Sequence, residues 1–125
     1  MNKAKILIVD DNEKFLDVLN EFLLANDFDV ACSINGEDAK NKFVEFKPAL
    51  VVTDIVMPDV DGIELLLSLR DINPDVRVIV MSGGNRGHAD TYLQMADKLG
   101  ASAILNKPFE LSDLLVQIKK LETAA

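Results

Sequence analysis

The sequence predicts an α/β domain in which an open parallel sheet is covered by helices on both faces. Short apolar runs alternate with segments of helical periodicity, and this strand-then-helix unit occurs five times. The connections between the units are short, as expected when each helix packs back onto the sheet. The first apolar run, residues 4–9, is continuous, which is typical of a strand buried on both faces of a parallel sheet.

The first strand ends at paired aspartates, where the period changes to that of a helix. Apolar side chains from Phe15 to Leu23 recur at i, i+4, i+7 and i+8, so they share one helical face. The polar residues 10–12 are available to cap this helix. We expect the helix to end near residues 26–27 and a second strand to follow at residues 30–34.

Glycine and proline bound the next two helices. The second helix opens at Gly36, and Pro48 prevents its continuation because the residue before a proline avoids helical geometry. The third strand, residues 50–53, precedes a helix that starts at residues 61–62 and ends at residues 73–74. We expect the sheet-facing side chains of this third helix to be Ile63, Leu66, Leu67 and Leu69.

The last part of the chain predicts two more strands, residues 76–81 and residues 101–105. A loop of small residues, 82–87, leads from the fourth strand into a helix over residues 89–99. Gly100 is placed to end that helix as its C-terminal cap. The final helix carries its apolar face on Leu111, Leu114, Leu115, Ile118 and Leu121.

Length and composition describe one domain with a full core. A chain of 125 residues buries about two-thirds of its unfolded surface, and a hydrophobic content of 49% excludes disorder. No apolar run approaches the ~20 residues of a membrane span, and the sequence opens on a strand instead of a signal peptide. The single Cys32, expected as core filler, fits a reducing compartment, so we expect a cytoplasmic protein. A net charge of −8 disfavours direct contact with nucleic acid.

Chemically capable residues follow four of the five predicted strands. They are Asp10 and Asp11, Asp54, Ser82 and Lys107. Ligands of open parallel sheets bind beyond the carboxyl ends of the strands, where the strand order reverses. If these four strands are neighbours, three carboxylates, a hydroxyl and an ammonium share one small volume.

Three carboxylates at close quarters repel one another and require a countercharge. Oxygen ligands in a water-exposed cleft suit Mg²⁺. A carboxylate also serves as a phosphoryl acceptor, and phosphoryl transfer depends mainly on charge neutralisation and alignment. We therefore interpret Asp54 as the acceptor, with metal ligands and oxygen-holding groups at the other positions. Taken singly, each residue also fits a structural role: strand-end or turn residue, helix cap, or solvated cation.

The combined pattern resembles the CheY-like receiver domains of bacterial two-component response regulators, and the resemblance spans the whole chain. The residues that carry it are Asp10-Asp11, Asp54-Ile55-Val56-Met57-Pro58, Asp61-Gly62, Ser82 and Lys107-Pro108-Phe109. The resemblance implies a flavodoxin-like (βα)5 fold with strand order 2-1-3-4-5. It further implies that Asp54 accepts a phosphoryl group from a histidine kinase or a histidine phosphotransfer protein.

The same resemblance implies a role for each site residue. Mg²⁺ would be held by Asp10, Asp11, Asp54 and the backbone carbonyl of Val56, with Asp10 acting through water. Ser82 would be the switch hydroxyl, and Lys107 would contact the phosphate.

The sequence departs from the family pattern at three places. Receivers commonly carry Tyr or Phe three residues before the lysine, where this chain has Ile104. We therefore expect activation to reshape the loop and the helix over residues 89–99 instead of flipping a ring. The glycine-containing loop over residues 83–88 is longer than usual, and we expect it to be mobile. Val56 offers no acid or amide to orient an attacking water, which predicts a long-lived phosphorylated state.

Three classes of function remain open at this point. The first is a phosphorylation-operated binding module, which is not a turnover enzyme. The second is a small Mg²⁺-dependent phosphatase that passes through an aspartyl-phosphate, and the third is a phosphate-independent interaction domain. We expect a single receiver domain over residues 1–125 with no output domain. Its target is then a separate protein or an output domain of a longer chain, and no motif identifies the kinase, the pathway or the oligomeric state.

Overall fold

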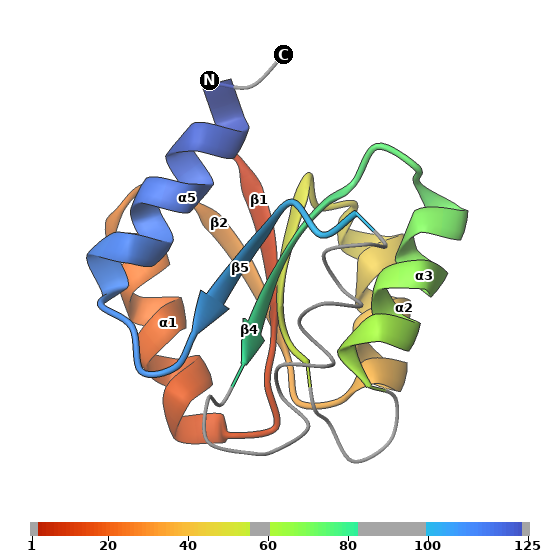
Figure 1. The fold of residues 1–125 in the computed structure, drawn as a ribbon, viewed down its shortest axis with the longest axis horizontal. Coiled ribbons are helices and arrows are strands. Elements are labelled where there is room, and N and C mark those ends of the chain that lie inside the picture. Colours follow the sequence, from red (N-terminus) through yellow and green to blue (C-terminus); the bar gives the residue numbers. More distant parts are fainter. Residues whose placement is uncertain (1–2, 56–60, 83–99, 124–125) are drawn as a thin grey trace.

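The computed structural model describes residues 3–55, 61–82 and 100–123, and its elements alternate between strand and helix (Figure 1). The strands are β1 (Lys5–Val9), β2 (Asp29–Ser33), β3 (Leu50–Asp54), β4 (Arg77–Ser82) and β5 (Ala103–Asn106). The helices are α1 (Glu13–Ala25), α2 (Gly36–Phe46), α3 (Gly62–Ile72) and α5 (Leu111–Thr123). The loop and the helix predicted between residues 83 and 99 lie outside the described residues.

The five strands form one sheet in the order β2-β1-β3-β4-β5, and every neighbouring pair is parallel. Helices α1 and α5 lie on one face of this sheet, and α2 and α3 lie on the other (Figure 1). The predicted flavodoxin-like architecture and strand order are therefore confirmed. The strand order reverses between β1 and β3, which is the place where open parallel sheets bind ligands.

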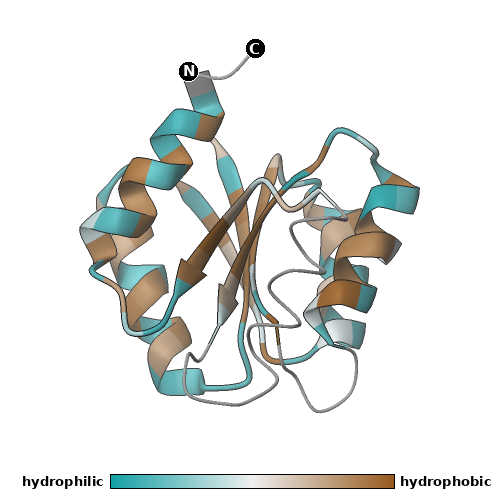
Figure 2. Ribbon diagram, in the orientation of Figure 1, coloured by the Kyte–Doolittle hydropathy of each residue, from teal (hydrophilic) through white to brown (hydrophobic). Residues whose placement is uncertain are grey.

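Two hydrophobic cores form because successive side chains of a strand point to opposite faces of the sheet. In β1, Ile6 and Ile8 pack with α1 and α5, whereas Leu7 and Val9 pack with α2 and α3. All four side chains are almost completely buried. Figure 2 shows the same arrangement, with hydrophobic strands at the centre and helices that alternate between polar and apolar residues. Cys32 is half-buried against the first of these cores, as expected for a core residue.

The prediction that Leu67 faces the sheet is wrong, because its side chain is 46% exposed. Leu66 and Leu69 are completely buried as predicted, and Leu65, which was not predicted to face the sheet, is also completely buried. At about 100° of rotation per residue, Leu67 lies about 160° around the helix from Leu69. A run of leucines has no periodicity of its own, so the sequence did not indicate which of them face outward.

The predicted strand boundaries shift by one or two residues, which is ordinary for element ends. Ser82 is the last residue of β4 and not the first residue after it, and it pairs with Asn106 of β5. β5 begins at Ala103, two residues later than predicted. Ile34 lies beyond the end of β2 and is 45% exposed.

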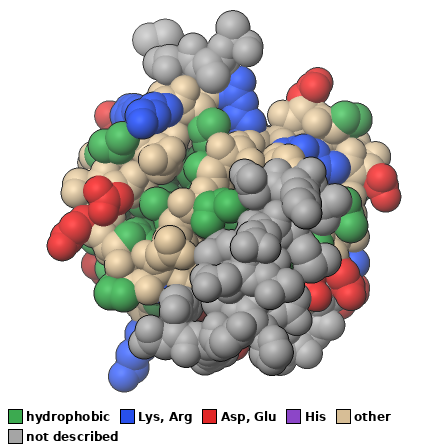
Figure 3. Space-filling view, in the orientation of Figure 1, with side chains coloured by type: hydrophobic (Ala, Val, Ile, Leu, Met, Phe, Trp, Pro, Cys, Tyr) green, Lys and Arg blue, Asp and Glu red, His purple; other side chains and the backbone are tan. Residues whose placement is uncertain are grey.

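The surface agrees with an acidic chain that carries charges of both signs. Figure 3 shows Lys and Arg side chains as well as Asp and Glu side chains on the drawn face, with hydrophobic side chains between them. Among the described residues, no helix is both long enough and apolar enough to cross a membrane.

The two leucines at positions 66 and 67 provide a matched test of the orientation of α3. We expect Leu66→Ala to lower the free energy of unfolding by about 2 to 5 kcal/mol, because it opens a cavity under a fully buried side chain. Leu67→Ala should change it by only about 0.5 kcal/mol, because that side chain is half exposed. Urea unfolding of both variants measures the difference, and equal losses would contradict the observed orientation.

Candidate functional site

The strands end level with one another at the carboxyl edge of the sheet. Val9 of β1 pairs with Thr53 of β3, and Asp54 pairs with Met81 of β4. Backbone hydrogen bonds extend this alignment past the strand ends, since Lys107 N donates to the Ser82 carbonyl oxygen over 2.6 Å. The residues predicted at the strand ends therefore all lie at this one edge.

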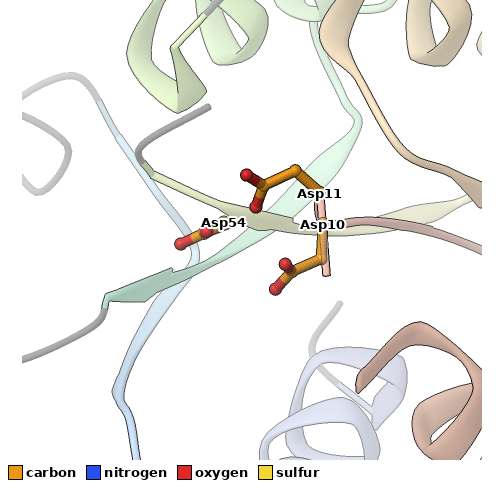
Figure 4. Close-up of side chains that lie close together, drawn as sticks. All are labelled: Asp10, Asp11 and Asp54. Carbon is orange, nitrogen blue, oxygen red and sulfur yellow. The ribbon is translucent and has the colours of Figure 1, made fainter. Parts of the chain in front are cut away.

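Three carboxylates converge at this edge, and Figure 4 shows them at neighbouring strand ends. Asp10, Asp11 and Asp54 each offer an oxygen, and these oxygens lie within 4.8 Å of one another. Asp10 is 1% exposed, Asp54 has a side chain that is 13% exposed, and Asp11 is exposed. The cluster thus has a buried side in the sheet and an open side toward solvent.

The start of α1 sets the positions of the two acids that follow β1. Asn12 is the N-cap, and its side chain accepts a hydrogen bond from Phe15 N. The alternative that Asp10 and Asp11 cap this helix is therefore wrong. Asp10 Oδ1 accepts instead from Asn12 N at 2.9 Å, and Asp10 N donates to the Ser33 carbonyl oxygen. These contacts leave Asp10 Oδ2 directed toward the other site residues.

Backbone packing holds Asp54 in place at the end of β3. Ile55 N donates to the Met81 carbonyl oxygen over 2.9 Å, and Gly62 N donates to the Ile55 carbonyl oxygen over 2.7 Å. A Cβ atom at Gly62 would lie 2.6 Å from the Asp54 carbonyl oxygen, so only glycine allows this approach. Asp61 caps α3 through a hydrogen bond from Glu64 N, as its predicted position at the helix start requires.

Lys107 supplies the positive charge of the site. Its Nζ lies 2.6 Å from Asp10 Oδ2 and 3.9 Å from Asp54 Oδ2, and its side chain is 23% exposed. The peptide bond between Lys107 and Pro108 is cis. Among the residues that the structure describes, this one ammonium faces three carboxylates and forms ion pairs with two of them.

The electrostatic result of this arrangement is strongest at Asp54. The pKa of this carboxyl is raised to about 6 as the net result of opposing effects. Burial raises it most, and the neighbouring Asp10 and Asp11 also raise it, whereas Lys107 and a hydrogen bond from the Ile55 backbone lower it. A bound cation would favour the ionised form, because opposite charge stabilises a carboxylate. The site therefore carries an excess of negative charge that a metal ion would relieve.

The donor set fits a hard divalent cation such as Mg²⁺. All three side chains offer carboxylate oxygens, which Mg²⁺ prefers. These oxygens lie within 4.8 Å of one another, so the three carboxylates could hold one such ion together. Val56, whose backbone carbonyl was predicted as a further ligand, lies outside the described residues.

Ser82 lies at the same edge of the sheet, whereas Ile104 lies within β5, two residues before its end. Ser82 is completely buried at the end of β4. Ile104 is half-buried in β5 and pairs with Val80 of β4. The loop and helix on which the prediction about Ile104 depends fall in the part of the chain that is not described.

One contact in the site was missed by the sequence analysis. The Lys107 Nζ lies 4.4 Å from the centroid of the Phe15 ring, and this ring also contacts Phe109. The helical period predicted Phe15 only as a core residue. The sequence did hold a signal for this contact. The helix directly follows the two acids, so a Phe in its first turn lies close to them.

Comparison with known proteins agrees with the fold and the site. The family model described as the response regulator receiver domain matches residues 6–119 of this chain. The chain is 34% identical to the transcriptional regulatory protein PrrA of Mycobacterium tuberculosis over 97% of its own length and 51% of that protein. It is 33% identical to sporulation initiation phosphotransferase F of Bacillus subtilis over 96% of its own length and 94% of that protein.

A solved response regulator receiver domain protein from Clostridium thermocellum has the same fold. It superposes with a TM-score of 0.86 at 29% identity, over 94% of this chain and 92% of that one. The chain spans about half the length of PrrA. Because the family model covers nearly all of the chain and the parallel sheet has the order 2-1-3-4-5, the chain belongs to the receiver domains of two-component response regulators, a family of signalling domains.

Proposed function

We propose that this receiver domain accepts a phosphoryl group on Asp54 in a Mg²⁺-dependent reaction. The donor is the phosphohistidine of a sensor histidine kinase or of a histidine phosphotransfer protein. The observation that carries the proposal is the convergence of Asp54 with Asp10, Asp11 and Lys107 at the carboxyl edge of the sheet. No other cluster of metal-binding side chains occurs among the residues with described positions.

The proposed chemistry is a direct transfer between two nucleophiles. A bond forms between an Asp54 carboxylate oxygen and the phosphorus, while the bond from phosphorus to the donor histidine nitrogen breaks. Lys107 neutralises charge on the transferred oxygens, and its position 3.9 Å from Asp54 Oδ2 places it within reach of them. Asp11, Asp54 and the Val56 carbonyl would hold Mg²⁺, with Asp10 acting through water, and the ion would neutralise phosphoryl charge. Ser82 supplies a hydroxyl to the product state.

The proposed consequence is a shift between two conformations that a partner distinguishes. The domain is a stoichiometric phosphoryl acceptor and is not a turnover enzyme. The partner that recognises its phosphorylated conformation is a separate protein target or an output domain of a longer chain. Residues 1–125 act as a single domain in the cytoplasm, without direct contact to nucleic acid or membrane.

Intact mass after incubation with acetyl phosphate tests the acceptor. We expect a single phosphoryl adduct in the presence of Mg²⁺ and none after chelation, because uncompensated carboxylates repel the incoming phosphate. Asp54→Ala should form no adduct, and Asp113→Ala, which removes an exposed carboxylate on α5, serves as the matched control. If the parent binds Mg²⁺ but forms no adduct, a phosphate-independent interaction domain becomes the better interpretation.

The raised pKa of Asp54 predicts a pH-dependent gain in stability when its charge is removed. The folded state binds this proton more tightly than the unfolded chain, whose carboxyl has the ordinary pKa of 3.8, so stability is lost as pH rises toward about 6. In chelator, Asp54→Asn should therefore be more stable than the parent above pH 6. The difference should shrink as pH falls from about 6 to about 4. Urea unfolding across this range measures it, and a constant difference would contradict the raised pKa.

The residue two positions after the acceptor predicts the lifetime of the phosphorylated state. Val56 cannot orient a water by hydrogen bonding, whereas an amide at this position can. We expect Val56→Asn to lose its phosphoryl group several-fold faster than the parent. The decay of the adduct mass after removal of acetyl phosphate measures both lifetimes, with Val56→Ala as the apolar control. Loss from the Asn variant at the parental rate would refute the prediction.

A further inference from the structure

The ammonium of Lys107 rests on an aromatic ring as well as on carboxylates. Its distance of 4.4 Å from the Phe15 centroid is within the range of a cation–π interaction. The same Nζ contacts Asp10 Oδ2 at 2.6 Å and lies 3.9 Å from Asp54 Oδ2. The ring therefore holds the lysine at the edge of the acidic cluster.

The Phe15 ring is itself held in place from two directions. The backbone N of Phe15 donates to Asn12 Oδ1, so the helix cap fixes its position in the chain. The ring packs edge to face with Phe109, with centroids 6.0 Å apart and planes at 76°. Phe109 stands two residues after Lys107, so one turn of the chain supplies both the cation and the ring that supports Phe15.

A metal in the acidic cluster would remove the closest partner of Lys107. Asp10 Oδ1 is engaged by Asn12 N, and Asp10 Oδ2 is the oxygen that Lys107 contacts. A cation that draws on Asp10 therefore competes with the lysine for this oxygen. A lysine that loses its ion pair gains access to many rotamers, because its four-carbon stem is flexible. The Phe15 ring would not bind the metal, so its contact with the Lys107 ammonium would remain.

We propose that Phe15 is a positioning residue that keeps the Lys107 ammonium beside Asp54 when Asp10 turns to the metal. This inference rests on the proposed function and adds a residue to the same site. A ring face suits this task because it attracts the ammonium without neutralising it, so the lysine retains its charge for the phosphoryl oxygens. Leucine at this position would fill similar space but would have no negative face.

Nuclear magnetic resonance of Lys107 tests the contact without any phosphorylation. The ring current of Phe15 should displace the ε-methylene protons of Lys107 upfield, with and without Mg²⁺. Phe15→Leu should abolish this displacement, and Phe15→Tyr should retain it. Loss of the displacement when Mg²⁺ is added to the parent would overturn the proposal, because the ring would then not hold the metal-displaced lysine.

The rate of adduct formation with acetyl phosphate tests the consequence. At saturating Mg²⁺ we expect Phe15→Leu to react roughly three- to tenfold more slowly than the parent, and Phe15→Tyr to react at the parental rate. In a Lys107→Met background, Phe15→Leu should have no further effect, because the ring acts only through the ammonium. Phe22→Leu is the matched control, since Phe22 is also a half-buried phenylalanine of α1 packed on the same core.

The outcomes separate this inference from the proposed function. An adduct that forms equally fast in the parent and in Phe15→Leu overturns the positioning role and leaves the acceptor role intact. Additive effects in the Lys107→Met background, or equal slowing by Phe22→Leu, assign Phe15 a merely structural role and also overturn the proposal. If the parent forms no adduct, the proposed acceptor role of Asp54 fails. The response of the Lys107 resonances to Mg²⁺ then still tests whether the Phe15 ring keeps its contact with Lys107. Phe15→Met replaces Phe15→Leu if the leucine variant does not fold.

Discussion

The excess of negative charge at the carboxyl edge of the sheet is the constraint on which the site depends. In the described part of the chain, three carboxylates share this edge with one ammonium, and Asp10 and Asp54 are largely removed from solvent. Desolvation and mutual repulsion both disfavour ionisation, which is why the pKa of Asp54 is raised to about 6. The ionised carboxyl of Asp54 therefore lowers the stability of the folded state. A bound cation would neutralise this excess charge, and the three carboxylates are placed to hold one.

The surrounding structure holds this unfavourable cluster in place mainly through backbone contacts. The parallel register aligns the strand ends, and Asn12, not an aspartate, caps α1. Gly62 lets the start of α3 approach the carbonyl of Asp54 to a distance that no side chain would allow. The acids therefore do not cap α1, and Asp10 Oδ1 makes only a local turn contact with Asn12 N. The three acids still offer oxygens that lie within 4.8 Å of one another, and Lys107 pairs with Asp10 Oδ2.

The sequence predicted the fold and most of the site because both depend on strong local signals. Buried strands, helix caps and strand-end acids follow from period and residue type, and the topology of a parallel sheet brings strand ends together. The orientation of α3 was predicted only in part, since in a run of leucines packing alone decides that Leu67 faces outward. The contact between Phe15 and Lys107 was not predicted, because it joins residues far apart in sequence and its only local signal was a Phe in the first turn after the two acids.

The ion pair between Lys107 and Asp10 links the metal to the lysine under the proposed function. Without a metal, the lysine is the main countercharge of the cluster, and its ammonium is committed to Asp10 Oδ2 at 2.6 Å. A divalent cation would supply a greater positive charge to the same oxygens, so the lysine would no longer be required there. Its ammonium, which lies 3.9 Å from Asp54 Oδ2, would then be available to a phosphoryl group on Asp54. One cation would thus replace another at Asp10, and a lysine that stabilises the unphosphorylated site would become part of the phosphorylated one.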